Sequence, residues 1–419
     1  MSTGLPKVLM LGWEFPPIIN GGLGVACHDL SAALSELAEV TMIVPKSRKD
    51  FKVKNVNLVG VNHIDLRSLT HQPGNLPFKL YSVPAELDPY YSVPGGAYAA
   101  MRLSDSGAGM FDIDNLYGGD VIAKVSQFSD IASSVSGDMD FDVIHAHDWM
   151  TMMAGIKIKQ KTGKPLVMHI HSLEIDRGGE HSKGWVYELE KKGMEYADLV
   201  MPVSHFTAEN IMRHYGISQD KIKVVHNGSN RVKPYKSERP YKEKTVLFVG
   251  RLTRQKGPEK FLDIASRVLQ CNPDVRFVVA GTGDYFRPML EKSSYQQIGN
   301  RFHMTGFLNV EKLQYLLSVS DVYCMPSVSE PFGLSAVEAA QFGVPCVISK
   351  QSGVAEVLQG ALKFDFWDID KAANYILSLI RDPVFSSQVA EDASHNLNHV
   401  TWEISAQKIM HAYQNNQFI

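Results

Sequence analysis

The strongest constraint on the fold is a strand–loop–helix–strand unit within residues 321–348. Residues 321–325 (DVYCM) form a short apolar run that is typical of a buried strand, and two prolines soon after it indicate a loop. A helical pattern then occupies residues 334–342, and a glycine and a proline separate it from a second apolar run at 346–348. This unit predicts two parallel strands joined by a helix, the repeat from which α/β proteins are built.

The same alternation occupies most of the chain. Further apolar runs predict buried strands at residues 7–12, 39–44, 78–83, 142–145, 165–169, 245–250 and 275–280. Helical patterns at 23–37 and 261–269 lie between them, and a polar stretch with two prolines at 231–244 is typical of a linker. Because 419 residues exceed what one hydrophobic core usually serves, we expect two α/β domains, residues 1–230 and 231–400.

Two glutamates, Glu330 and Glu338, lie on either side of the junction between the loop and the helix of the opening unit. Ligands of parallel sheets bind at the carboxyl ends of the strands, where loop amides and helix N-termini face outward. We therefore expect the amides of Phe332, Gly333 and Leu334 to be available to an anion. An isolated glutamate is most often a solvated surface acid, but a charge kept beside an aromatic residue and a glycine in SEPFG favours a bound polar group.

Glycine-rich loops after two of the predicted strands are candidate binding loops. Gly21 and Gly22 belong to a GGLG segment before the first predicted helix, and Gly281 and Gly283 belong to a GTG segment after the strand at 275–280. Glycine lets the backbone approach a ligand closely, but it also serves tight turns, and GGLG is not the GxGxxG dinucleotide fingerprint. Both interpretations stay open for these loops.

Arg251 and Lys256 follow the predicted strand at 245–250. Two such cations can be ordinary surface residues. The carboxyl end of a strand beside a helix N-terminus is an anion site, however, and the two side chains supply the charges that a diphosphate requires. We predict a phosphate clamp at this loop.

Two histidine-bearing segments are predicted at strand ends in the first half. HAHDW places His145 and His147 two residues apart, and because no cluster of cysteines or carboxylates completes a structural zinc set, we expect no metal there. A histidine that caps the strand end by hydrogen bonding is the plain alternative. HIHSLEIDRGG follows the next strand as a charged loop that carries more polar groups than a solvated face needs, so we expect it to face a ligand. Its candidate residues, which the resemblance given next places on the acceptor side, are His171, Glu174, Asp176 and Arg177.

These motifs resemble, in the same order along the chain, those of the retaining GT-B glycosyltransferases, the superfamily that includes glycogen and starch synthases. EPFGLSAVEAAQFGVPC is similar to the E-x7-E signature, GRLTRQKG to the phosphate-clamp loop, and RFHMTGFL to the base-contacting segment. HAHDW, and EFPP followed by GGLG, are similar to the motifs of the first domain. The resemblance implies a GT-B fold, two Rossmann-like α/β domains with parallel sheets facing across a central cleft, and a helix at 401–419 that packs back on the first domain.

The resemblance also implies a reaction and roles for the residues. Acceptor contacts belong to domain 1–230 and nucleotide-sugar contacts to domain 231–400. Arg251 and Lys256 would stabilise the charge of the leaving nucleotide diphosphate, Glu330 and His147 would orient the sugar, and Glu338 would hold the ribose. We expect a hexose, glucose by analogy, to pass with retention from an ADP- or UDP-sugar to a carbohydrate acceptor, without a metal or another cofactor.

Two features leave the acceptor open. Asn20 stands where bacterial glycogen synthases commonly have a lysine, and a Gly-, Tyr- and Ser-rich stretch at 85–119 is too aromatic for ordinary disorder. The stretch is either an acceptor-side lid or a packed structural excursion. A transferase for a polysaccharide or a lipid-linked acceptor is therefore an alternative to a glycogen-synthase-like enzyme.

Composition excludes several other classes. The 42 Lys and Arg against 45 Asp and Glu give no basic excess for nucleic acid, and no apolar run approaches the ~18 residues needed to cross a bilayer, although peripheral membrane contact stays open. The four cysteines are scattered, as in reduced cytoplasmic proteins.

Other protein classes with related folds fit the sequence less well. A sugar-nucleotide epimerase shares the two Rossmann-like halves but lacks the E-x7-E motif with EPFG. A glycogen phosphorylase is about twice as long and needs pyridoxal phosphate. An inactive scaffold would not need the clamp cations, and an NAD dehydrogenase needs the missing GxGxxG.

Overall fold

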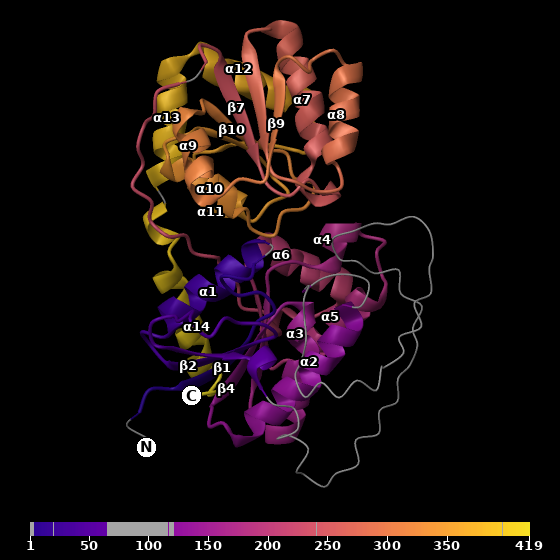
Figure 1. Ribbon diagram of the computed structural model, residues 1–419, viewed down its shortest axis with the longest axis vertical. Helices are drawn as coiled ribbons and strands as arrows, with labels where there is room; N and C mark the ends of the chain where they lie inside the picture. Colours follow the sequence, from indigo (N-terminus) through magenta and orange to yellow (C-terminus); the bar gives the residue numbers. More distant parts are fainter. Residues whose placement is uncertain (1–3, 20, 65–115, 117–120, 240, 396) are drawn as a thin grey trace.

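The computed structural model describes residues 4–19, 21–64, 116, 121–239, 241–395 and 397–419. It contains two six-stranded parallel sheets, one in each half of the chain (Figure 1). The expected α/β fold with two parallel sheets is confirmed. Asn20, the predicted strand at 78–83 and the stretch at 85–119 lie outside the described residues, apart from Leu116.

The first sheet has the strand order β3-β2-β1-β4-β5-β6, and all neighbouring strands pair in parallel. Its strands are β1 (Lys7–Leu11), β2 (Glu39–Val44), β3 (Val56–Gly60), β4 (Val143–His147), β5 (Leu166–Ile170) and β6 (Leu199–Pro202). Its helices are α1 (Gly22–Leu34), α2 (Val121–Val135), α3 (Trp149–Thr162), α4 (Glu174–Gly178), α5 (Trp185–Tyr196) and α6 (His205–Asn210).

Alternate side chains of each central strand enter different cores. Leu9 and Leu11 of β1 belong to the core that α2, α3 and α5 cover, whereas Val8 and Met10 belong to the core on the opposite face. A strand buried on both faces reads as a continuous apolar run, which is why the sequence predicts β1 so well.

The second sheet has the strand order β12-β11-β10-β7-β8-β9 and is also parallel. Its strands are β7 (Lys244–Val249), β8 (Val275–Ala280), β9 (Phe302–Gly306), β10 (Val322–Met325), β11 (Cys346–Ser349) and β12 (Leu362–Phe364). Its helices are α7 (Pro258–Cys271), α8 (Phe286–Tyr295), α9 (Val310–Val319), α10 (Leu334–Gln341), α11 (Val354–Val357), α12 (Ile369–Arg381) and α13 (Pro383–His395).

The last helix, α14 (Trp402–Asn415), belongs to the first sheet although it follows the second in sequence (Figure 1). It begins where the Thr401 side chain accepts a hydrogen bond from the amide of Ile404. It packs on α1, and its buried Trp402 and Tyr413 join the core on that side of the sheet. The chain therefore crosses between its two halves twice.

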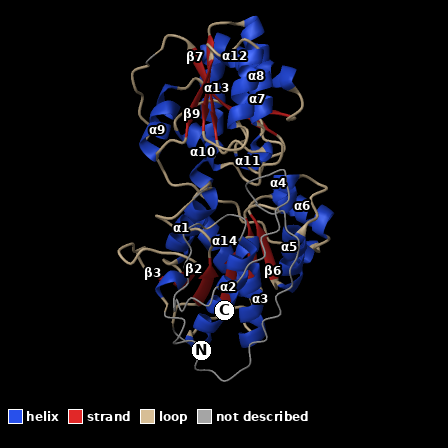
Figure 2. Cartoon of the chain, turned by 45° about the vertical axis from the view of Figure 1, so that its right-hand side comes forward, coloured by secondary structure: helices blue, strands red, loops and turns tan. Residues whose placement is uncertain are grey.

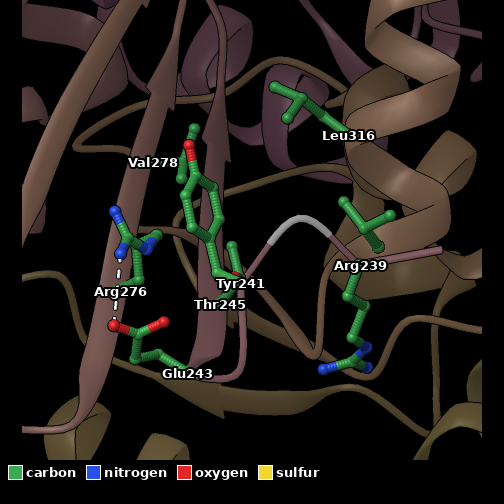
Figure 3. A pocket seen from close by; sticks show the side chains of 8 residues that line it. Arg239, Tyr241, Glu243, Thr245, Arg276, Val278 and Leu316 are labelled. Atoms are coloured by element: carbon green, nitrogen blue, oxygen red, sulfur yellow. Dashed lines mark hydrogen bonds and ion pairs between the residues drawn. The ribbon is translucent and has the colours of Figure 1, made fainter.

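The first crossing is anchored at the amino ends of β7 and β8. The guanidinium carbon of Arg276 lies 3.8 Å from the ring centroid of Tyr241, and Arg276 also bonds Glu243 at 3.3 Å (Figure 3). Arg239 pairs with Asp321 at 2.7 Å. Arg239, Tyr241, Glu243 and Arg276 line a pocket at this edge of the sheet, opposite the carboxyl ends where ligands of parallel sheets bind. This pocket is a linker anchor, and the candidate site lies elsewhere.

Candidate active site

The carboxyl ends of the two sheets face each other. In both views, α10 and α11 lie at the end of the second half that faces the first, and α1, α4 and α6 lie at the facing end of the first half (Figures 1 and 2). Hydrogen bonds join the two halves here. The residues predicted to bind the donor and the acceptor come from strand ends, loops and the first turns of helices on this side of the two sheets.

Gly21 of the first half lies against the predicted clamp of the second. An added Cβ at Gly21 would be 3.7 Å from the guanidinium carbon of Arg251, so a larger side chain would crowd this cation. The Gly21 amide donates to Oε2 of Glu14 at 3.1 Å, and Glu14 is only 2% exposed. Glu14 was missed by sequence reasoning, although it is the first residue of the EFPP motif. It fixes the loop that enters α1 at Gly22.

Lys256 and Glu330, both predicted site residues, are in direct contact. The Lys256 ammonium forms an ion pair with Oε2 of Glu330, and the Ser327 hydroxyl donates to the same oxygen at 3.4 Å. Glu330 is 5% exposed. A carboxylate removed from water is stable only when it is paired and hydrogen-bonded, and the lysine meets that condition here. The predicted clamp and the predicted sugar-orienting acid are thus one charged unit.

The predicted glycines differ in what they accommodate. A Cβ at Gly281 would lie 1.9 Å from the carbonyl oxygen of Gly250, and one at Gly283 would lie 2.6 Å from that of Leu252. At these two positions the absence of a side chain leaves room for the backbone of the clamp loop itself. Gly333, with φ of 105°, precedes the first turn of α10, a backbone conformation that side-chain-bearing residues rarely adopt.

Glu338 lies in the middle of α10 and Phe332 just before it. Burial raises the pKa of Glu338 to about 7. In the described part of the chain, its carboxylate has no hydrogen-bond or ion-pair partner.

Phe332 is buried, with its ring centroid 6.2 Å from that of His226 of the first half, so it packs between the halves. Leu334 opens the helix and is partly exposed. Phe307, in the predicted base-contacting segment, is 81% exposed just beyond β9.

Four histidines form an array at the carboxyl ends of β4 and β5. His147 and His169 are cross-strand neighbours in register, with ring centroids 5.2 Å apart, and His171 stacks on His169 at 4.6 Å. Nδ1 of His147 and Nε2 of His171 are 2.9 Å apart. Burial lowers the pKa of His145, His147 and His169 well below the ordinary value, and it lowers the pKa of His171 to about 3. All four imidazoles are therefore neutral at pH 7.

Within this array, His171 and His147 differ in access. His147 is fully buried, and its Nε2 has no hydrogen-bond partner among the described residues. His171 is partly exposed. Of the two predicted histidines, His171 is the one that reaches the surface of the site, and His147 supports it from behind.

Nitrogen atoms of His145, His147 and His169 come close enough together to consider a metal ion. Both nitrogens of His145 already have partners, however: the hydroxyl of Tyr413 at 2.5 Å and Nδ1 of His169 at 3.0 Å. A metal would have to replace these bonds, so the hydrogen-bonded reading of the array fits the geometry better.

Asp148 joins the two histidine segments. Its Oδ1 accepts hydrogen bonds from the amides of His171 at 2.6 Å and Ser172 at 3.3 Å. Its φ of 57° is unusual for a residue other than glycine, a conformation that costs about 1–3 kcal/mol and is retained where surrounding bonds enforce it. Burial raises the pKa of Asp148 to about 7, although these amide bonds work in the other direction. The two amide hydrogen bonds to Asp148 hold the loop that carries His171.

The predicted acceptor-side residues separate into two groups. Arg177 pairs with Glu174 at 3.2 Å and with the buried Glu190 at 2.7 Å, so Arg177 and Glu174 form an inward network that ties α4 to α5. Asp176 faces the second half instead. Its Oδ1 accepts a hydrogen bond from Ser329 at 2.5 Å, and burial raises its pKa to about 6. Of the predicted acceptor-side residues, the buried Asp176 thus contacts the second half directly, and His171 is the partly exposed histidine of the array.

A second junction holds the Glu330 loop against the first half. Both carboxylate oxygens of Glu356 in α11 accept amide hydrogen bonds at the start of α6, from His205 at 2.9 Å and Phe206 at 2.7 Å. Nε2 of His226 lies 2.8 Å from the same carboxylate. The Ser204 hydroxyl, which also caps α6, donates to the carbonyl of Pro331 at 2.6 Å, next to Glu330. Sequence reasoning gave no signal for Glu356.

Known families match both halves of the chain. Residues 7–223 match the family described as the starch synthase catalytic domain, and residues 230–396 match the group 1 glycosyl transferases. An uncharacterised glycosyltransferase of Methanocaldococcus jannaschii is 26% identical, with 97% of this chain and 98% of the relative covered. The glycogen synthase of Mycobacterium tuberculosis is 25% identical, with 97% of this chain and 94% of the relative covered.

Among the described residues, no helix has both the length and the apolar character needed to span a membrane.

Solved structures share the whole fold. A sucrose-phosphate synthase from Thermosynechococcus elongatus superposes with a TM-score of 0.73 at 18% identity, covering 98% of both chains. The HepE protein of Anabaena, in complex with UDP-glucose, superposes with a TM-score of 0.67 at 18% identity, covering 98% of this chain and 99% of that one. With a starch synthase catalytic domain in its first half and a group 1 transferase domain in its second, the chain belongs to the GT-B glycosyltransferases of glycogen and starch synthase type.

Proposed function

We propose that this enzyme transfers glucose, with retention of anomeric configuration, from a nucleotide diphosphate sugar to a carbohydrate acceptor. The observation that carries the proposal is the meeting of Gly21, Arg251 and the Lys256–Glu330 pair at the junction of the two halves. Backbone amides at the start of α1 and two cations suit a diphosphate, and a carboxylate beside them suits the hydroxyls of the attached sugar.

The proposed chemistry follows from these charges. Breaking the bond between the anomeric carbon and the phosphate leaves an oxocarbenium-like carbon and a nucleoside diphosphate that gains negative charge. Arg251 and Lys256 stabilise the diphosphate, so the residues described here supply the electrostatic role that a metal has in other transferases. We expect the reaction to need no metal or other cofactor.

Glu330 orients the sugar and does not attack it. Its charge is neutralised by Lys256, which makes it a weak nucleophile. We favour a same-face transfer in which the acceptor hydroxyl bonds to the anomeric carbon while its proton passes to the leaving phosphate oxygen. His171, which is partly exposed, contacts the sugar in this proposal, and His147 holds His171 through the bond between their rings. Glu338 accepts hydrogen bonds from the ribose.

Donor and acceptor follow from the relatives by analogy. The relative named glycogen synthase favours a glucan acceptor, and the neighbour in complex with UDP-glucose favours a glucosyl donor. ADP-glucose and UDP-glucose are the first donors to test. Asp176, which accepts a hydrogen bond from Ser329 of the second half and has a pKa of about 6, is the group that we assign to the acceptor hydroxyls.

A donor screen tests the proposal. Release of nucleoside diphosphate from ADP-glucose, UDP-glucose and their galactose and mannose analogues is measured without acceptor and then with glucans of increasing length. Proton NMR of the product distinguishes an α-linked from a β-linked sugar and so tests retention. Conversion of the donor to an isomeric nucleotide sugar, without acceptor-dependent release, would instead identify an epimerase.

A further inference from the structure

The C-terminal helix contributes a side chain to the histidine array. Tyr413 of α14 is fully buried, and its hydroxyl oxygen lies 2.5 Å from Nδ1 of His145. α14 is reached only after the chain has completed the second sheet. A residue near the C-terminal end of the chain thus lies in the core on one face of the first sheet, in contact with the histidine array.

From Tyr413 the contacts continue to the surface of the site. Nε2 of His145 lies 3.0 Å from Nδ1 of His169, and His169 stacks on His171 with an angle of 14° between the rings. His171 is the partly exposed member of the array and is bonded to His147. A continuous series of contacts therefore joins α14 to the histidine that we place against the donor sugar.

The hydrogen bonds of this series favour one order of its protons. Burial raises the pKa of Tyr413 well above the ordinary value, so the hydroxyl keeps its proton, and His145 is its one hydrogen-bond partner among the described residues. When Tyr413 donates to Nδ1, His145 must carry its own proton on Nε2 and donate to Nδ1 of His169. His169 then also carries its proton on Nε2. The opposite order would leave both the buried hydroxyl proton of Tyr413 and the Nε2 lone pair of His169 without a partner among the described residues, whereas the first order leaves the Nε2 proton of His169 without one.

We infer that Tyr413 is a positioning residue for the transfer reaction, because its hydroxyl sets the tautomers of His145 and His169 and thereby fixes the ring on which His171 stacks. The helix α14 then completes the active site in addition to closing the fold. The catalytic part of this inference rests on the proposed function, since it takes His171 to contact the donor sugar. The tautomer part does not depend on any activity.

The test is Tyr413→Phe in the full chain, which removes one hydroxyl and keeps the ring. Long-range proton–nitrogen NMR spectra of protein labelled with nitrogen-15 in histidine report which ring nitrogen carries the proton. We expect His145 and His169 to be Nε2–H tautomers in the parent protein and to shift to Nδ1–H, or to a mixture, in Tyr413→Phe. We also expect kcat to fall about tenfold while the donor KM stays within about twofold, since a misplaced supporting ring impairs the transition state more than binding.

Tyr187→Phe is the matched control. Tyr187 is a buried tyrosine of the same half, and its hydroxyl donates to the carbonyl of His214 at 2.6 Å, away from the array. Its variant loses one hydrogen bond of the same kind and should change neither the histidine tautomers nor kcat. His145→Gln, which interrupts the series nearer to His171, should lower kcat at least as much as Tyr413→Phe does.

Unchanged tautomers in Tyr413→Phe would overturn the inference. Shifted tautomers with an unchanged kcat, or an equal loss of kcat in Tyr187→Phe, would overturn the link between Tyr413 and the reaction. A parent protein that released nucleotide from none of the donors would refute the proposed function instead, and the NMR result would still decide whether Tyr413 sets the proton order.

Discussion

The ammonium of the partly exposed Lys256 and the buried carboxylate of Glu330 form an ion pair between two loops that are 74 residues apart in sequence. The loops follow β7 and β10, which are neighbours in the centre of the second sheet. In the proposed function, the lysine binds the diphosphate and the glutamate binds the sugar. A bound donor would therefore share the lysine with Glu330, and the pair holds both groups in place beforehand.

Arg251→Ala and Lys256→Ala should each weaken the binding of ADP and UDP. Each substitution removes a charge-assisted phosphate contact worth about 1.5–3 kcal/mol, which corresponds to a loss of about tenfold to 100-fold in affinity. Isothermal titration calorimetry measures it. Lys292→Ala is the control, because Lys292 forms a surface ion pair with Asp263 at 2.8 Å in the same half of the chain. Unchanged affinity in both clamp variants would show that the diphosphate binds elsewhere.

Glu330→Gln and Glu338→Gln should have opposite kinetic signatures. Glu330 is assigned to the sugar, so its loss should lower kcat by about 100-fold, or about 2.7 kcal/mol, while nucleotide affinity changes little. Glu338 is assigned to the ribose, whose contacts are the same in the ground and transition states, so its loss should mainly raise the donor KM. Steady-state kinetics with circular dichroism as the folding check separates the two. Small and equal effects would mean that neither glutamate touches the donor.

Transfer should survive the removal of divalent metals. The proposed charge stabilisation comes from Arg251 and Lys256, so we expect the initial rate in excess EDTA to stay within about twofold of the rate without it. If EDTA abolished the rate and Mg²⁺ or Mn²⁺ restored it, a metal would have to be placed beside the diphosphate, and the clamp assignment would need revision.

Glu356→Gln should loosen the junction between the two halves. Its carboxylate accepts two amide hydrogen bonds at the start of α6 and pairs with His226, and hydrogen bonds to a charged group contribute about 1.5–3 kcal/mol each. Small-angle X-ray scattering should show a larger radius of gyration in the variant, and kcat should fall because the Glu330 loop is no longer held to the first half. Glu291→Gln, in a surface pair with Arg287, should change neither quantity. A variant with the parent's scattering and kcat would show that other contacts fix the junction.

The sequence predicts the central strands and the loops after them because both faces of those strands are buried. The unit from β10 to β11 was predicted almost residue for residue, since prolines and glycines delimit it. β3 and β12 are edge strands with partly exposed residues, and their weaker apolar pattern gave no prediction. Edge strands carry less of the hydrophobic signal on which such predictions depend.

The site was predicted only as far as local motifs reach. The clamp cations and Glu330 lie in recognisable loops, and Glu338 lies in the helix that follows. Glu190 and Glu356, in contrast, contact partners outside their own motifs. Glu356 and the amide of His205 are 151 residues apart. The role of the glycines in the GTG segment could not be predicted for the same reason. Only the fold shows that the backbone of the clamp loop, and not open space, lies against Gly281 and Gly283.

Acid should destabilise the fold through the buried histidines, with a sign that follows from their pKa values. In the folded chain the pKa of His169 is well below 6.5, so below about pH 6.5 the unfolded chain binds a proton that the folded chain does not. The stability that His169 contributes is therefore complete above pH 6.5 and is lost as the pH falls, by up to about 1.4 kcal/mol per pH unit. Buried acids act in the opposite direction: Asp148 and Glu190, each with a pKa of about 7, stabilise the fold more as the pH falls from 7 towards 4.

Because these two contributions offset each other in the parent protein, the test compares His169→Gln with the parent. The free energy of unfolding in urea is measured for both at pH 7.5, 6.5 and 5.5. The variant should be less stable at pH 7.5, since it disturbs the array, but the difference should narrow by up to about 1.4 kcal/mol between pH 6.5 and 5.5, because only the parent still carries the unprotonated buried imidazole. His411→Gln, on the exposed side of α14, should follow the parent at every pH. Parallel curves for the parent and His169→Gln would show that His169 takes up its proton as readily in the folded chain as in the unfolded one.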